Sequence, residues 1–280
     1  MKTVTTRAEL AREVASARAA GRRIGFVPTM GYLHEGHLAL CDDVAHVADF
    51  IVMSIFVNPL QFGPTEDFAQ YPRDLEKDSM LAAGRGVDVL YAPDVAEMYA
   101  AGETRVFVTA DALESRLCGA FRPGHFRGVL TVVAKLFNMV APDVAVFGQK
   151  DLQQYVLLQR MVRDLDFPID MRIAPIVREA DGLAMSSRNV YLSTSERADA
   201  PVIYRSLMAA GEVFRAGGAS SDQVLAAARQ ALALTPSINL QYLNLIDVDT
   251  LTDVDQPAAG NALAFAGYLG RTRLIDNVIL

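Results

Sequence analysis

Short apolar runs recur along the first 176 residues and are separated by segments with helical periodicity. Apolar runs of this length, alternating with helices of about 10 to 15 residues, indicate βαβ units, which place parallel strands in one sheet covered on both faces. The sequence therefore predicts a Rossmann-like, doubly wound α/β domain. The predicted strands are Ile24–Val27, Phe50–Val57, Val87–Tyr91, Val144–Phe147 and Met171–Val177.

The clearest helical patterns in this part cover His34–Ala48 and Val129–Met139, because apolar residues recur on one helical face. After about residue 176 the pattern changes to helices followed by neighbouring strands, which is typical of a smaller α+β domain. We therefore predict two domains, at residues 1–176 and 177–280. The elements expected in the second are helices near Ala200–Ala216 and Asp222–Leu234, and strands at Leu240–Val248, Ala262–Tyr268 and Arg271–Asp276.

Composition excludes several classes of protein. The N-terminus lacks the apolar core of a secretory signal, and the longest apolar run, Phe50–Val57, is far shorter than the roughly 20 residues that span a membrane. The net charge of -7 provides no basic field that could follow a phosphate backbone. Cys41 and Cys118 lack the spacing of metal ligands. We expect a cytoplasmic protein that has neither a nucleic-acid nor a membrane partner.

The stretch VPTMGYLHEGH, residues 27–37, places two of the four histidines three residues apart where a predicted strand passes into a helix. Ligands of parallel sheets bind beyond this end of the strands, and a helix N-terminus favours an anion. Gly31 and Gly36 allow the backbone to approach a ligand, while His34 and His37 share one face of the first turn and could donate to phosphate oxygens. The alternative is that one histidine caps the helix and the other packs.

Two further segments fit a triphosphate. Gly148 and Lys150, in FGQKD, follow another predicted strand, and the lysine is either a phosphate contact or a solvated surface residue. MSSRN, residues 185–189, combines two hydroxyls with a guanidinium and suits the β- and γ-phosphates with Mg²⁺, although it could also be a helix cap. Neither G-x-x-x-x-G-K-[ST] nor G-x-G-x-x-G occurs, which argues against kinase-like and dinucleotide-binding proteins. What remains is a triphosphate site that leaves the α-phosphorus open to attack.

Several separate blocks of the sequence together resemble one family. The blocks VPTMGYLHEGH, FVNPLQFG, YPR, RPGHFRGV, FGQKDLQQ and MSSRN occur in this order between residues 24 and 190, and the chain is similar in them to the pantoate–β-alanine ligases. That family belongs to the nucleotidylyltransferase superfamily, whose H-x-G-H signature stands here at 34–37. The resemblance implies an AMP-forming ligase that condenses pantoate with β-alanine. ATP with Mg²⁺ would activate pantoate as an adenylate, pyrophosphate and AMP would be released, and the enzyme would be a homodimer.

The resemblance also implies which residues bind ATP. His37 would be the catalytic acid, with His34 and Lys150 beside it on the phosphates, and no protein residue is assigned to a metal. Val177 would contribute its backbone, and 185–188 would close over the phosphates. Some members have Glu at the position of Gln149, which implies that the backbone there does the binding. The full set is Met30, Gly31, Tyr32, Leu33, His34, Glu35, Gly36, His37, Gly148, Gln149, Lys150, Asp151, Val177, Met185, Ser186, Ser187 and Arg188.

For the other two substrates, pantoate and β-alanine, the resemblance implies that Gln61 and Gln154 bind pantoate and that β-alanine also lies close to Gln61. Amides suit an unactivated hydroxy acid because they can donate to its hydroxyls and carboxylate without adding charge. Without the resemblance, each glutamine would be interpreted as an exposed polar residue. Arg122, in RPGHFRG, is implied as a further phosphate contact.

Three rival functions share parts of this pattern. A nucleotidylyltransferase that forms a dinucleotide also has H-x-G-H, but it needs a mononucleotide pocket where Gln61 and Gln154 stand. An aminoacyl-tRNA synthetase shares the signature, yet the acidic balance and the short chain provide nothing to hold tRNA. An ATP-binding sensor or scaffold on the same fold would show ATP binding without turnover.

Overall fold

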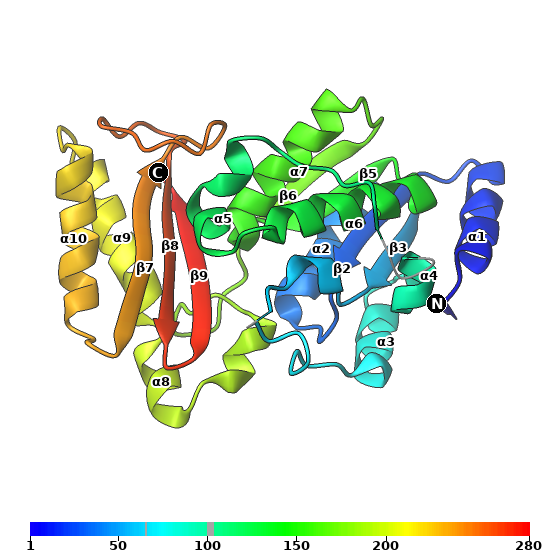
Figure 1. Cartoon of the computed structure of the whole chain (residues 1–280), viewed down its shortest axis with the longest axis horizontal. Helices are drawn as coiled ribbons and strands as arrows, with labels where there is room; N and C mark the ends of the chain where they lie inside the picture. Colours follow the sequence, from blue (N-terminus) through cyan, green and yellow to red (C-terminus); the bar gives the residue numbers. More distant parts are fainter. Residues whose placement is uncertain (65, 100–103) are drawn as a thin grey trace. The chain divides into compact units, whose positions relative to one another are not determined.

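The computed structural model describes residues 1–64, 66–99 and 104–280, and the chain divides into two compact units (Figure 1). The first unit contains 1–148 and 157–175, and the second contains 149–156 and 176–280. The division near 175 lies close to the expected domain boundary. Residues 149–156, which the sequence analysis assigns to the first domain, group with the second unit because their turn is bonded to its last strand.

Within the described part of the first unit, six parallel strands form one sheet in the order β1-β4-β3-β2-β5-β6. The strand order reverses between the adjacent strands β2 and β5, as it does in a doubly wound sheet. The five predicted strands are all present, and β1 is an addition that the sequence analysis did not find. The strands are β1 (Lys2–Val4), β2 (Ile24–Thr29), β3 (Phe50–Ile55), β4 (Val89–Tyr91), β5 (Val144–Gly148) and β6 (Asp170–Ala174).

Helices pack against both faces of this sheet. Phe26 of β2 meets Phe137 of α6, with 6.4 Å between ring centroids, while the next residue, Val27, belongs to a buried cluster with Cys41 and Val44 of α2. Neighbouring strand residues point to opposite faces, so α6 and α2 cover opposite sides, and the doubly wound α/β prediction is confirmed. The helices are α1 (Arg7–Ala19), α2 (Glu35–Ala45), α3 (Leu75–Gly84), α4 (Val95–Met98), α5 (Leu117–Phe121), α6 (His125–Val140) and α7 (Leu152–Asp164), of which α7 has its first residues, 152–156, in the second unit.

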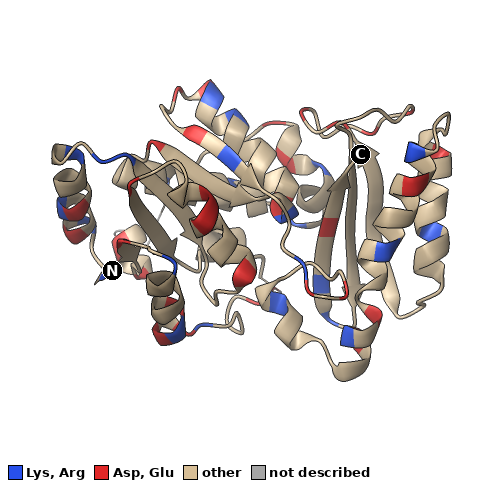
Figure 2. Ribbon diagram, turned by 180° about the vertical axis from the view of Figure 1, so that it is seen from behind, with Lys and Arg blue, Asp and Glu red and all other residues tan. Residues whose placement is uncertain are grey.

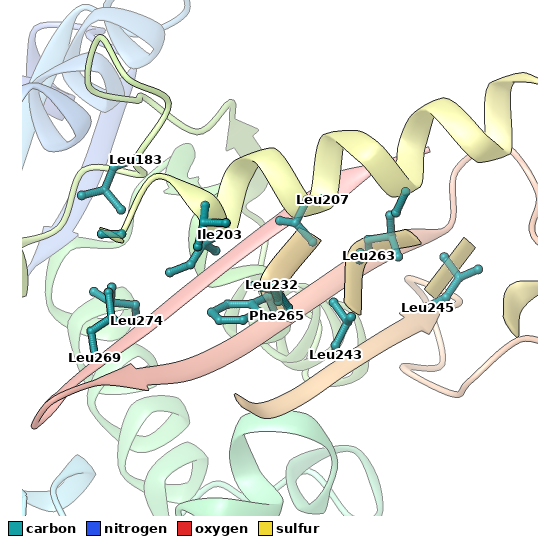
Figure 3. Packing of buried hydrophobic residues seen from close by; sticks show 14 of the residues in the cluster. Leu183, Ile203, Leu207, Leu232, Leu243, Leu245, Leu263, Phe265, Leu269 and Leu274 are labelled. Atoms are coloured by element: carbon teal, nitrogen blue, oxygen red, sulfur yellow. The ribbon is translucent and has the colours of Figure 1, made fainter. Parts of the chain in front are cut away.

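The second unit, whose residues are all described, packs helices on a three-stranded antiparallel sheet in the order β7-β8-β9. Figure 3 shows Ile203 and Leu207 of α9 turned toward Phe265 and Leu263 of β8 in its buried core. This arrangement confirms the predicted smaller α+β domain. Its elements are α8 (Thr194–Asp199), α9 (Val202–Arg215), α10 (Ser221–Ala233), β7 (Ile238–Ile246), β8 (Ala262–Leu269) and β9 (Thr272–Ile279).

Acidic and basic residues are interspersed along the helices, as the colours of the ribbon in Figure 2 show. Arg85, for example, pairs with Glu35 and Asp42 of α2, each at 2.5 Å. Among the described residues, no helix has both the length and the apolar character that crossing a bilayer requires.

Candidate active site

The H-x-G-H turn connects the end of β2 to the start of α2, as the sequence predicts, and a buried carboxylate holds its backbone. Asp78 of α3, 1% exposed, accepts hydrogen bonds from the backbone N–H groups of Tyr32 and Leu33, both at 2.7 Å. Burial raises the pKa of the Asp78 carboxyl, and these two hydrogen bonds oppose that rise. Gly31 has φ +85°, and a Cβ there would lie 2.9 Å from the carboxylate and 2.8 Å from Ile55. Glycine is therefore required at this turn.

Both histidines of the turn use the same ring nitrogen to cap α2. His34 Nδ1 accepts from the Gly36 N–H at 3.1 Å, and His37 Nδ1 lies 3.4 Å from the His34 N–H, with the two rings 4.1 Å apart. An accepting Nδ1 places the proton of a neutral imidazole on Nε2. Capping and donation to a ligand would thus use different nitrogens, so the helix cap that is present does not compete with the predicted contact to phosphate.

Gln61 closes the short 3₁₀ helix η1 (Pro59–Gln61), and its side chain has a fixed orientation. Its Oε1 accepts from Asn58 Nδ2 at 3.2 Å, while its Nε2 lies 3.0 Å from the sulfur of Met30. Asn58 is 1% exposed and is itself held by the Tyr99 hydroxyl, which donates to its Oδ1 at 2.7 Å. The structure thus places the predicted pantoate residue beside the first residue of the predicted ATP turn.

The backbone of Gln61 is held from the start of α6. The His125 ring donates from Nδ1 to the Gln61 carbonyl at 2.8 Å, which leaves Nε2 to accept from Arg122 at 3.1 Å. Arg122 also forms two 2.6 Å hydrogen bonds to Glu66. Burial raises the pKa of the Glu66 carboxyl, but the hydrogen bonds and charge of Arg122 outweigh burial and leave that pKa lowered. A phosphate contact by Arg122, as predicted, would therefore compete with Glu66 for the guanidinium.

In the second unit, the turn η4 (Gln149–Asp151) carries Lys150, whose ammonium lies 3.4 Å from the Asp151 carboxylate. The Gln149 side chain donates to Asn277 of β9 at 3.0 Å. Gln154 is half-buried in α7. Asn277 lies outside every sequence block that carried the resemblance.

The remaining predicted ATP residues belong to a small hairpin and the turn after it. Met185 donates its N–H to the Val177 carbonyl at 3.0 Å, so these two predicted contacts face each other. Ser186 caps the 3₁₀ helix η5 (Ser187–Tyr191) by accepting from the Arg188 N–H at 3.2 Å. The cap that the sequence offered as an alternative is present, and it fixes the backbone next to Ser187.

Sequence reasoning missed three buried polar residues that hold these segments: Asp78, Asn58 and Asn277. Asn58 lies inside the block FVNPLQFG, three residues before Gln61, and this proximity in the sequence could have identified it as part of the site. Asp78, between Lys77 and Ser79, and Asn277, next to Asp276, gave no such signal. Within the described ranges, no group of three or more His, Cys, Asp or Glu side chains is placed to hold a metal ion.

An open parallel sheet with an H-x-G-H turn beyond the strand at its reversal point defines an α/β enzyme of the nucleotide-binding class. Comparison with known proteins narrows this class to one family. The sequence model of the pantoate-beta-alanine ligases matches residues 2–279. The pantothenate synthetase of Moorella thermoacetica is 51% identical over 280 residues, which cover 100% of this chain and 99% of that protein.

Solved structures agree with this result. The pantothenate synthetase of Thermus thermophilus has a TM-score of 0.94 and 49% identity, with 100% of this chain and 99% of that chain covered. The pantoate-beta-alanine ligase of Francisella tularensis, complexed with beta-gamma ATP and beta-alanine, has a TM-score of 0.80 and 30% identity, with 100% and 97% covered. The chain belongs to the pantoate–β-alanine ligase family, and is accordingly a ligase that joins pantoate to β-alanine.

Proposed function

We propose that this chain uses ATP to condense pantoate with β-alanine through a pantoyl-adenylate, releasing pyrophosphate and AMP. The observation that carries the proposal is the contact between the H-x-G-H turn and Gln61 through Met30. Through this contact, Gln61, the residue predicted to bind pantoate, lies beside a backbone turn that suits an anion. The Francisella tularensis relative, described as a complex with beta-gamma ATP and beta-alanine, supports ATP as a substrate.

The first half-reaction activates the pantoate carboxylate, because a free carboxylate is a poor acyl donor at neutral pH. A pantoate carboxylate oxygen forms a bond to the α-phosphorus of ATP, and the bond from that phosphorus to the pyrophosphate oxygen breaks. His34 and His37 would donate from Nε2 to the oxygens on which charge grows, and Lys150 would stabilise the departing pyrophosphate. Mg²⁺ enters as the Mg-ATP complex, so the metal belongs to the substrate.

In the second half-reaction, the β-alanine amine attacks the carbonyl carbon of the adenylate. A C–N bond forms, the C–O bond to AMP breaks, and the amine releases a proton. Keeping the adenylate away from water prevents its hydrolysis between the two steps. His37 would act as the acid of the reaction.

The proposal assigns each predicted residue to one substrate. The turn 30–37, the segment 148–151, the backbone of Val177 and the turn 185–188 would bind ATP. Gln61 and Gln154 would bind pantoate, and β-alanine would also lie near Gln61. Because Asn58 donates to Gln61 Oε1 and one Nε2 hydrogen points to the Met30 sulfur, the other Nε2 hydrogen is the one that would donate to a carboxylate or hydroxyl oxygen of pantoate. A phosphate contact by Arg122 would compete with its ion pair to Glu66.

We further propose that the enzyme acts as a cytoplasmic homodimer, which the family resemblance supports. Light scattering of the purified chain should then give twice the mass of the 30.4 kDa protomer.

A rapid-mixing experiment tests the reaction itself. Enzyme mixed with Mg-ATP and pantoate, without β-alanine, should release about one pyrophosphate per active site and then nearly stop, because the adenylate stays bound. Adding β-alanine should start steady turnover with AMP as the nucleotide product. Formation of ADP, or pyrophosphate release that does not depend on pantoate, would refute the proposal. An enzyme that forms a dinucleotide would ignore pantoate, and a scaffold would release no pyrophosphate.

A further inference from the structure

The side chain of Asn277, in β9, forms hydrogen bonds to the turn that carries Lys150. Its Nδ2 donates to the carbonyl of Gln149 at 2.9 Å and to the carbonyl of Lys150 at 3.1 Å, while its Oδ1 accepts from the Gln149 side chain at 3.0 Å. The residue is 3% exposed. Both amide hydrogens and the amide oxygen therefore have partners within a single turn, and the Gln149 side chain serves to orient this amide.

The neighbouring residue, Asp276, holds the other phosphate-binding segment of the second unit. Its carboxylate accepts two hydrogen bonds from Arg178, at 2.6 and 2.9 Å. Arg178 pairs in a β-bridge with Ala184, donates to the Gly182 carbonyl at 3.1 Å and stacks 3.8 Å from the centre of the Tyr204 ring. Asp276 thus fixes the hairpin that ends at Met185, where the turn 185–188 begins.

Consecutive residues of a strand point to opposite faces of the sheet. Leu274 and Val278, two positions on either side of Asp276, belong to or pack on the core under α9, so Asp276 faces the helices and Asn277 faces the other side. Each residue therefore reaches a different segment. Because a paired strand is stiff, the two side chains set the position of the Lys150 turn relative to the turn 185–188.

We propose that Asn277 is a positioning residue of the ligase. It holds the backbone of Gln149 and Lys150 so that the Lys150 ammonium contacts the phosphates that residues 185–188 bind. This inference rests on the proposed function, because Lys150 and 185–188 are ATP contacts only within it. The proposal assigns no substrate contact to any residue of β9. The effect of Asn277 passes entirely through the turn that it bonds.

The sheet offers a matched control. Asn244 of β7 lies in the same row as Asn277, since each is paired with Ala264 of the strand between them. The Asn244 side chain donates to Asp253 at 2.8 Å, in a turn far along the chain from both phosphate-binding segments. Asn244→Ala therefore removes the same side chain from the same sheet without touching the Lys150 turn.

The measurement is the rate of pyrophosphate release in a single turnover with Mg-ATP and pantoate. Asn277→Ala should slow it about 10²-fold, the scale expected when a reacting group moves by about 1 Å. The KM for pantoate should stay within about twofold of the unmodified enzyme. Asn244→Ala should react at the unmodified rate. An Asn277→Ala rate equal to that of Asn244→Ala would overturn the proposal.

A double-mutant cycle separates positioning from general damage to the fold. If Asn277 acts through Lys150, adding Asn277→Ala to Lys150→Ala should slow the reaction little further. If Asn277→Ala lowers the rate by the same factor in the unmodified enzyme and in Lys150→Ala, Asn277 does not act through Lys150. If Lys150→Ala alone forms the adenylate at the unmodified rate, the proposed positioning role is also refuted. Failure of the proposed function would look different, as pyrophosphate release independent of pantoate in the unmodified enzyme.

If Asn277→Ala does not fold, Asn277→Asp serves instead. It keeps the size and the acceptor for Gln149 but sets a carboxylate against two carbonyl oxygens. The same loss of rate is expected, and adenylation at the rate of Asn244→Ala would overturn the proposal.

Discussion

Gly128→Ala tests whether the close approach of α6 to η1 positions Gln61. A Cβ at residue 128 would lie 2.2 Å from the Leu60 carbonyl oxygen, 2.5 Å from its carbon and 2.7 Å from the Gln61 nitrogen. All three atoms are backbone, so no side-chain rotation relieves the overlap. Non-bonded carbon contacts are most favourable at about 3.5 to 4.0 Å, so the two elements must separate by about 1 Å.

That displacement acts on a residue held from two directions. Asn58 bonds both the Gln61 side chain and the Gly128 carbonyl, and His125 bonds the Gln61 carbonyl. Separating α6 from η1 therefore strains these contacts together and moves the amide proposed to bind pantoate. We expect kcat/KM for pantoate to fall about 10²-fold. Overpacking should also lower the free energy of unfolding by about 1 to 3 kcal/mol.

Steady-state kinetics with pantoate as the varied substrate, together with denaturant unfolding, measure both effects. Gly84→Ala is the control, because Gly84 is the last residue of α3 and a Cβ there meets nothing within 4 Å. It should leave kinetics unchanged and raise stability by roughly 0.4 to 1 kcal/mol. A Gly128→Ala enzyme with normal kcat/KM for pantoate would refute the reasoning, whatever its stability.

Two further predictions concern His37 and Glu66. His37→Ala should lower turnover by roughly 10²- to 10³-fold with a smaller change in ATP affinity; near-normal turnover of the folded variant would make this histidine purely structural. The pKa of Glu66 is lowered from 4.5, so its stabilisation is present above pH 4.5 and is lost as the pH falls through the lower folded-state pKa. The unfolding free energy should therefore exceed that of Glu66→Gln by about 1 to 3 kcal/mol at pH 7 and approach it in acid. A difference in unfolding free energy between the two proteins that stays the same at every pH would contradict this.

The fold was predictable where apolar side chains set the pattern. Buried strands such as β2 and β5 are continuous apolar runs, and α6 buries a full face. The missed elements lack that signal. β1 has only three residues, two of them exposed, and α3 buries only Asp78 and Ala82, so neither shows the period of its structure.

For the candidate site, the sequence predicted only where each segment lies between its neighbouring elements. The H-x-G-H turn could be placed between a strand and a helix because both flanks have clear patterns. The residues that hold the site segments could not be placed, because Asp78 stands 45 residues from Leu33 and Asn277 stands 128 residues from Gln149. A hydrogen bond across such a separation depends on the packed fold, and no local period reports it.

Two of the buried polar residues, Asp78 and Asn277, follow one physical rule. Each turn proposed to bind substrate leaves backbone groups that no helix or strand satisfies, and a buried group without a partner is costly. Where the turn exposes N–H groups, at Tyr32 and Leu33, the partner is the carboxylate of Asp78, which only accepts. Where the turn exposes carbonyls, at η4, the partner is the amide of Asn277, which donates twice. The polarity of each partner thus matches the backbone it holds. Since each partner comes from another packed element of the same unit as its turn, the turns are fixed before substrate arrives, which is the condition for stabilising a transition state without reorganisation.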